Sequence, residues 1–164
     1  MADTLTKDCF TGQLVERNYT EEEKQAIEQQ KINDFGNLKQ QKKNEIDLAC
    51  KGAITGGFNS TAHENTDKVY DSTLEDQANI TGNALSAVSK VSGVPGCEND
   101  KFYYHARGEE FVEWQATECL QLARDFKIFK EQQLVRNKQL QVYVDTLNTI
   151  EEVQSVTWDT VVPT

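Results

Sequence analysis

The stretch from Gln115 to about Asp145 constrains the fold most, because its apolar residues recur at spacings of three and four. That spacing places them on one face of a single long helix. Lys130, Gln133 and Asn137 interrupt this face, and such polar groups commonly set the register between packed helices at a cost in stability. The alternative is that this part of the helix is exposed to solvent. The apolar residues are Cys119, Leu122, Ala123, Phe126, Phe129, Leu134, Leu140, Val144 and Leu147.

Three capping boxes mark the starts of further helices. In a capping box, a Ser or Thr hydroxyl accepts a hydrogen bond from a backbone N–H three residues later, and the acidic side chain at that position reaches back. The pattern begins at Thr20, Ser72 and Thr149. It predicts helices near 20–35, 73–90 and 149–157, beside the one near 115–145.

A further helix is predicted near 37–55, where apolar residues again share one face. It ends at Gly56-Gly57, because glycine tolerates the left-handed conformation that often follows a helix. We expect the chain to bend or break at Gly36, since glycine weakens a helix interior. The helix near 20–35 is therefore interpreted as a separate linker helix.

The clearest β signal is a pair of segments rich in strand-forming residues, 102–106 and 110–114. The short loop between them predicts an antiparallel hairpin over 102–114. Phe58 and Val69-Tyr70 are expected to form two shorter strands around a polar loop. Residues 3–19 show no helical period and are expected to be extended, with a turn at Gly12.

These elements predict an α+β protein that is mostly helical, with long helices packed against a small antiparallel β-hairpin. The expected organisation is an extended N-terminal arm (1–19), a linker helix (20–36) and a helical domain (37–164). The composition agrees with a thin core spread along helices, because only 37% of residues are apolar.

The charge balance narrows the classes of partner. Acidic residues outnumber basic ones 27 to 17, which gives a net charge of −10. This charge disfavours nucleic acid and membrane surfaces, both of which are negative. No apolar run approaches the roughly 20 residues that span a bilayer. The acidic start Met1–Thr4 is followed by no apolar segment, so no secretory signal is expected.

Catalytic and metal-binding patterns are weak in this sequence. The zinc candidates His63, His105, Cys97 and Cys119 lack the close ligand spacing of zinc sites. The acids Glu75 and Asp76 fall in a first helical turn, where the helix dipole favours them without any catalytic role. We therefore expect no enzyme activity, no metal and no cofactor. The four cysteines, Cys9, Cys50, Cys97 and Cys119, are expected to be free thiols.

The aromatic residues of the predicted hairpin are the best candidates for a binding surface. A hairpin has two faces, and a small core covers only one of them. Tyr and Trp are enriched in binding hot spots, so the other face could present aromatics to a partner. The candidate protein-binding residues are Phe102, Tyr104, Phe111 and Trp114. Partner contact and plain filling of the core are equally favoured alternatives here.

Residues from about 38 to 158 resemble a phage-tail-associated domain family of unknown function. The resemblance lies in Glu45-Ile46, Ala53-Ile54, Gly57–Ser60, Val69–Ser72, Glu75–Gln77, Phe111–Trp114, Thr149–Glu152 and Trp158. The upstream segment Thr11–Glu23 resembles a linker in small phage tail proteins, where it joins a β segment to a helix.

The resemblance implies a virion protein of the bacteriophage tail, from a baseplate, tail tip or fibre attachment. It would be assembled in the bacterial cytoplasm and would bind other phage tail proteins, with homo-oligomers expected within the tail. An assembly chaperone that leaves before the virion matures is the alternative. An enzyme such as a wall hydrolase has no motif in its favour.

Overall fold

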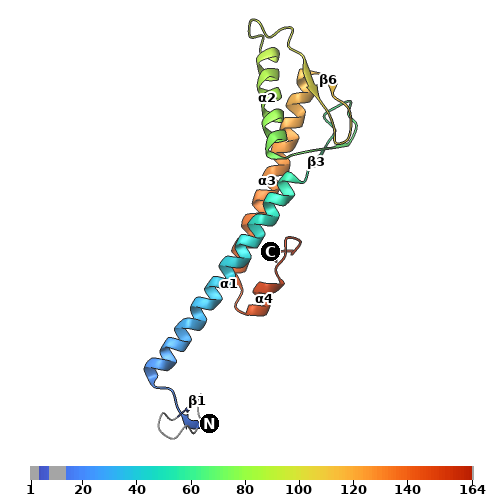
Figure 1. Cartoon of the computed structure of the whole chain (residues 1–164). Coiled ribbons are helices and arrows are strands. Elements are labelled where there is room, and N and C mark those ends of the chain that lie inside the picture. Colours follow the sequence, from blue (N-terminus) through green and yellow to red (C-terminus); the bar gives the residue numbers. More distant parts are fainter. Residues whose placement is uncertain (1–3, 8–13, 164) are drawn as a thin grey trace.

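Two long helices dominate the computed structural model, which describes residues 4–7 and 14–163. Helix α1 (Glu21–Thr55) and helix α3 (Ala116–Thr146) run antiparallel along the molecule. Helix α2 (Leu74–Val91) follows α1 along the same side of α3, and the short helix α4 (Ile150–Ser155) folds back at the far end (Figure 1). The predicted α+β class, mostly helical, is confirmed.

Helix α1 is continuous, so the predicted break at Gly36 and the separate linker helix are wrong. The capping box at Thr20 begins the helix as predicted, with Glu23 N donating to Thr20 Oγ1. A glycine costs a helix only about 1 kcal/mol. Phe35 and Leu38, on either side of Gly36, pack against a core formed with α3 and α4, which offsets that cost.

Gly36 lies in open space, because a Cβ added there would meet no atom within 4 Å. We therefore expect Gly36→Ala to raise the free energy of unfolding by about 0.5–1 kcal/mol. Gly57→Ala is the contrasting variant: its φ is +104°, and a Cβ there would lie 2.9 Å from Tyr70 O. Thermal unfolding should move up for the first variant and down for the second. A lower unfolding temperature for Gly36→Ala would contradict the placement of Gly36 in an open position inside a continuous helix.

Helix α2 begins one residue later than its predicted capping box. The box uses Thr73 and Asp76, whereas Ser72 and Glu75 were expected. Ser72 is fully buried instead, and its hydroxyl donates to Ile54 O at 2.6 Å and accepts from Gly57 N at 3.0 Å. This hydroxyl therefore joins the end of α1 to the start of α2.

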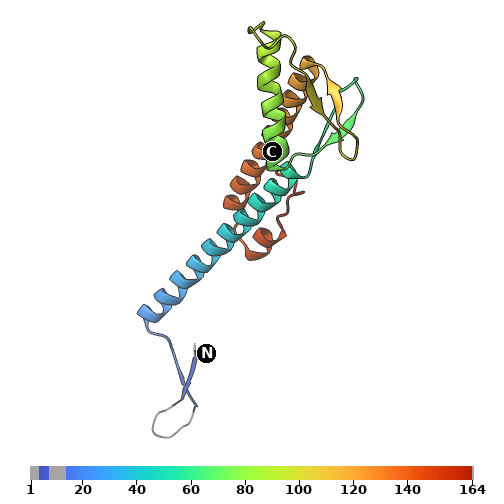
Figure 2. The ribbon, with the colours of Figure 1, turned by 45° about the horizontal axis from the view of Figure 1, so that its top comes forward.

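Among the described residues, the strands form three separate antiparallel pairs. Strands β3 (Phe58–Ser60) and β4 (Lys68–Tyr70) confirm the expected short pair, with Phe58 opposite Tyr70. Strands β5 (Phe102–Tyr104) and β6 (Val112–Trp114) confirm the hairpin, although each is shorter than predicted. Strands β1 (Thr4–Lys7) and β2 (Leu14–Arg17) pair before α1, and the turn predicted at Gly12 lies outside the described residues. Figure 2 shows the β3–β4 and β5–β6 pairs beside α2 and the first half of α3.

Two cores divide the molecule into a head (residues 56–126) and a stalk (residues 21–55 and 127–163). The head core is rich in aromatic residues and joins both hairpins to α2 and α3; it contains Phe58, Tyr70, Ile80, Phe102, Tyr104, Trp114, Leu122 and Phe126. The stalk core joins α1, α3 and α4 and contains Ile46, Leu140, Val144, Leu147, Val153 and Val156. Leu134, predicted on the buried face of α3, is exposed instead.

The polar interruptions on α3 contact the neighbouring helices. Asn137 and Gln141 both donate to Asp47 Oδ1 of α1, at 2.8 and 2.7 Å. Lys130 Nζ donates to Gln77 Oε1 of α2 at 3.1 Å. These contacts agree with the interpretation that polar groups set the register of the packed helices, since sliding α3 by one turn would break all three.

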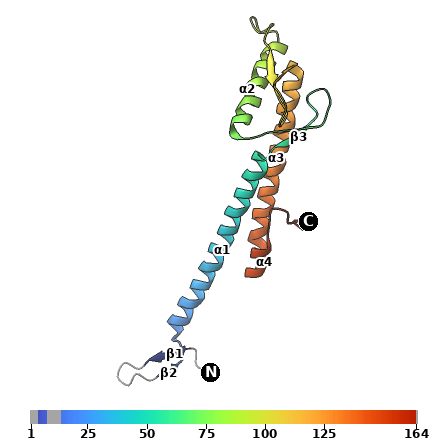
Figure 3. The ribbon, with the colours of Figure 1, turned by 45° about the vertical axis from the view of Figure 1, so that its right-hand side comes forward.

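The first part of α1 extends beyond the stalk core. Residues 21–34 are exposed except for the half-buried Glu23, and Figures 1 and 3 show this part projecting past α3 and α4 toward strands β1 and β2. The stalk thus ends in a projecting and largely exposed stretch of α1.

Candidate interaction surface

The inner face of the β5–β6 hairpin carries three of the four predicted binding residues. Phe102, Tyr104 and Trp114 are only 3–6% exposed and belong to the head core. Phe102 and Trp114 are opposite each other in the register, so they point to the same side. The prediction that these three residues are exposed and bind a partner is therefore wrong, because this face of the hairpin packs against the helices.

Trp114 is the centre of an aromatic cluster that joins the two hairpins. Its indole meets the rings of Tyr70 and Tyr104 edge-on, each with centroids 5.7 Å apart, and His63 stacks on it at 4.7 Å. Edge-to-face contacts of this kind stabilise beyond their buried area. Burial, with Glu109 and Glu118 nearby, raises the pKa of Tyr70 to about 12, so this phenol stays neutral inside the core.

Glu118 fastens the loop between β3 and β4 to the first turn of α3. Its carboxylate accepts from Glu64 N at 3.2 Å and from Gln115 N at 2.7 Å, and His63 Nδ1 lies 3.3 Å away. Burial alone would raise the pKa of Glu118, but the two backbone hydrogen bonds and His63 outweigh it and hold the pKa below its ordinary value. The charged form is therefore the one that the fold stabilises.

This lowered pKa predicts a loss of stability in acid. A carboxylate whose folded pKa lies below its unfolded value stabilises the fold above the unfolded pKa and loses that contribution as the pH falls through the folded pKa. We expect wild type to be more stable than Glu118→Gln at neutral pH. The difference in free energy of unfolding between the two proteins should narrow as the pH falls below 4.5, the ordinary pKa of a glutamate. Thermal unfolding of both proteins across a pH series measures it, and a gap independent of pH would contradict the assignment.

The outer face of the hairpin remains exposed and includes the fourth predicted residue. Phe111 is 65% exposed and Tyr103 is 51% exposed. The Phe111 ring lies 4.3 Å from that of His105, measured between centroids. Phe111 therefore stays a candidate contact residue, and Tyr103, which sequence reasoning placed in the hairpin but did not select, joins it.

An open groove of about 550 Å³ separates this hairpin from α2. Its hairpin side is aromatic, and its α2 side is formed by small or neutral residues with one acid. The lining residues are Asp76, Ala78, Asn79, Gly82, Asn83, Ser86, Tyr103, Tyr104, His105 and Phe111. We call this the head groove. Its mixture of aromatic, amide and hydroxyl groups suits a protein segment as ligand.

The turn beside the head groove is held firmly by Arg107. Arg107 Nε donates to Asp71 Oδ1 at 2.6 Å, and Nη2 donates to Gly56 O at 2.7 Å. The neighbouring ion pair between Lys68 and Glu109 is 2.6 Å long. These contacts fix residues 105–111 against the end of α1 and strand β4, so Phe111 is presented on an ordered turn.

Helix α2 adds a second exposed apolar face beside the groove. Leu74, Leu85 and Val88 are exposed, whereas Ile80 and Ala87 face the core. No charged residue occurs from Gln77 to Ser89, although the chain as a whole carries a net charge of −10. Contiguous exposed apolar residues often mark contact sites.

The potential metal ligands and the cysteine thiols of this chain bear on what chemistry it can perform. Among the described residues, no three potential metal ligands come together. Cys50, Cys97 and Cys119 are free as predicted, and Cys9 lies outside the described part. Burial, with Glu118 nearby, raises the pKa of the Cys119 thiol to about 11, which makes it a poor nucleophile.

Fold and surface together define an elongated helical protein that presents an aromatic groove at one end. The chain belongs to the family described as a domain of unknown function (DUF4376), whose model matches residues 37–159. No curated protein and no solved structure matches it. Within the described residues, no helix has both the length and the apolar character to cross a membrane.

Proposed function

We propose that this protein is a structural component of a bacteriophage tail, at the baseplate, tail tip or fibre attachment, and that it acts through protein–protein contacts. The sequence resemblance to phage-tail-associated domains suggests the setting. The observation that carries the proposed mode of action is the head groove, with Phe111 and Tyr103 exposed on an ordered turn. Exposed aromatic residues beside a groove are typical anchors of protein interfaces.

The shape of the molecule supports a bridging role. The head lies at one end, and the projecting part of α1, which leads to strands β1 and β2, lies at the other (Figure 1). The stalk between them is held in register by Asp47, Asn137 and Gln141. A rod of this kind can hold two tail proteins at a fixed separation. We propose other tail proteins and further copies of this chain as its partners.

The chemistry of the head agrees better with binding than with catalysis. Ser60, the buried hydroxyl nearest in sequence to His63, donates to Asp125 Oδ2 at 2.5 Å. Asp76 caps α2 by accepting from Thr73 N at 2.9 Å. These groups are engaged in structural hydrogen bonds, and we propose no nucleophile or general base among them.

Mass spectrometry of purified virions from the phage or prophage that encodes the chain tests the proposal. A structural component should be present in mature particles in fixed proportion to the other tail proteins. If the protein associates with tail proteins in lysates but is absent from virions, it is an assembly chaperone instead. Absence from both would overturn the phage-tail assignment.

A further inference from the structure

Helix α3 exposes a regular seam on the side turned away from α1. The seam comprises six exposed residues, spaced alternately by four and three, which is the spacing of a coiled-coil contact face. Its members are Ile128, Gln132, Val135, Gln139, Val142 and Thr146. The apolar members Ile128, Val135 and Val142 repeat every seventh residue. The buried face of α3 already packs within the head and stalk, so this seam is a second regular face of the same helix that is left exposed.

The charges beside the seam alternate in sign. Along one edge, at intervals of seven, lie Arg124, Glu131, Lys138 and Asp145, and all four are exposed. In the described structure Glu131 pairs with the exposed Lys127 at 3.4 Å, and Asp145 pairs with the half-buried Lys43 at 2.6 Å. In a coiled coil, residues at this edge position choose the partner and its orientation.

This alternation is complementary to itself when two α3 helices run antiparallel. About a two-fold axis near Leu134, Glu131 faces Lys138 of the second copy, and Arg124 faces Asp145 of the second copy. Symmetry repeats each pair, as an isologous interface requires. A parallel arrangement would set Glu131 beside Arg136 of the second copy, but it would set Arg124 and Lys138 beside the uncharged Phe129 and Tyr143. The charges therefore favour the antiparallel orientation.

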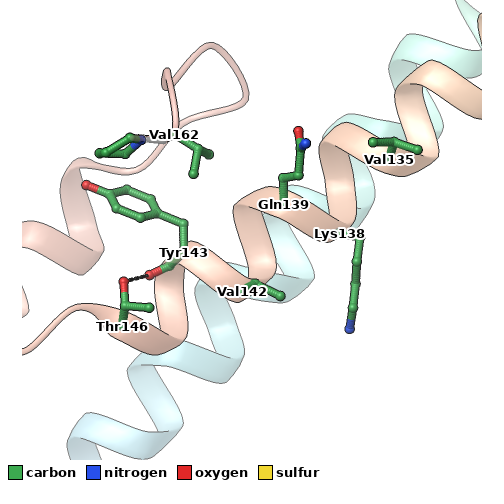
Figure 4. A pocket seen from close by; sticks show the side chains of 8 residues that line it. Val135, Lys138, Gln139, Val142, Tyr143, Thr146 and Val162 are labelled. Carbon is green, nitrogen blue, oxygen red and sulfur yellow. Dashed lines mark hydrogen bonds between the residues drawn. The ribbon is translucent and has the colours of Figure 1, made fainter.

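A groove lies on the same seam. In the antiparallel arrangement, Ile128 of the second copy would lie opposite this groove. It has a volume of about 560 Å³ and is mainly apolar. Figure 4 shows Val135, Gln139 and Val142 of α3 on one side and Val162 of the C-terminal tail across from Tyr143. An isoleucine side chain from a second copy suits this lining.

From the seam, its edge charges and the groove, we infer that two copies of this chain pair through α3 as an antiparallel dimer. Each copy seats Ile128 near the groove of the other. Four ion pairs, two between Glu131 and Lys138 and two between Arg124 and Asp145, fix the register. The inference is independent of the phage-tail proposal, because it rests only on α3 and the C-terminal tail.

Charge reversal tests this dimer. Sedimentation or light scattering should give the wild-type chain a mass of twice the 18.6 kDa of one copy. Glu131→Lys and Lys138→Glu each place like charges at both central pairs, so each variant alone should self-associate roughly tenfold or more weakly. An equal mixture of the two should restore the dimer, because every 131–138 contact again joins opposite charges. The double variant should dimerise for the same reason.

Lys51→Glu and Glu28→Lys are matched controls, since they reverse exposed charges on α1 and should leave the mass unchanged. Circular dichroism confirms that each variant is folded. A wild type that stays monomeric, or that forms trimers, overturns the inference. So do single variants that dimerise like wild type, and a mixture of folded variants that remains monomeric. None of these results changes what virion mass spectrometry should find. The dimer and the phage-tail function can therefore be disproved independently of each other.

Discussion

Trp114→Ala should lower the free energy of unfolding by about 3–5 kcal/mol, the usual cost of truncating a buried aromatic residue. Trp114 is 3% exposed and contacts Tyr70, Tyr104 and His63, so its loss leaves a cavity where the two hairpins meet. For a chain of this size the unfolding temperature should fall by roughly 6–20 °C. Thermal unfolding followed by circular dichroism measures the change.

Two further variants separate packing from hydrogen bonding in this result. The indole Nε1 of Trp114 is buried without a hydrogen-bond partner among the described residues, so Trp114→Phe removes no hydrogen bond and should cost clearly less than Trp114→Ala. Tyr103→Ala, in the same hairpin but exposed, should cost about 1 kcal/mol or less. If Trp114→Ala unfolds at the wild-type temperature, the placement of Trp114 in the head core is wrong.

Phe111→Ala should act on assembly and leave the fold almost unchanged. If Phe111 anchors a tail partner in the head groove, its truncation should weaken the contact by about 2 kcal/mol, roughly thirtyfold. The side chain is exposed and its ring contact is with His105, so the unfolding temperature should change little. Incorporation of the variant into virions, measured beside its thermal unfolding, gives both quantities.

Leu48→Ala provides the matched control for Phe111→Ala. Leu48 is 67% exposed on α1, so its truncation removes a similarly exposed apolar side chain far from the head groove. It should assemble like wild type. Equal incorporation of both variants would show that the head groove is not the contact site, and the exposed face of α2 would then be the next surface to test.

The sequence predicted the helices well because their signals are local. Apolar spacing along α3 and the Thr20 and Thr149 capping boxes depend on residues a few positions apart. The break at Gly36 was wrong for the opposite reason. A cost of about 1 kcal/mol is a local quantity, whereas the packing of Phe35 and Leu38 that offsets it depends on α4, more than a hundred positions along the chain.

The binding surface was less accessible to such reasoning. Because side chains alternate along a strand, Phe111 and Trp114 are expected on opposite faces of the hairpin, but this alternation cannot tell which face the helices cover. The head groove also depends on α2, and the turn beside it is fixed by Arg107 through Asp71, 36 positions earlier. Pairs so distant in sequence leave no periodic signal. In the sequence, the exposed face of α2 is marked by the long uncharged stretch from Gln77 to Ser89.

The projecting part of α1 owes its helical structure to the part of the same helix that is packed. A helix of some 14 residues is marginal in water because its first turn is unfavourable to form. Here residues 21–34 extend a helix that the stalk core already holds from Phe35 onward. Amide hydrogens should therefore exchange slowly beyond Phe35 and progressively faster toward Glu21, as fraying spreads from the N-terminal end of α1. A partner that binds this end would slow hydrogen exchange along the whole segment, so the exchange rate of residues 21–34 would reveal whether a partner is bound.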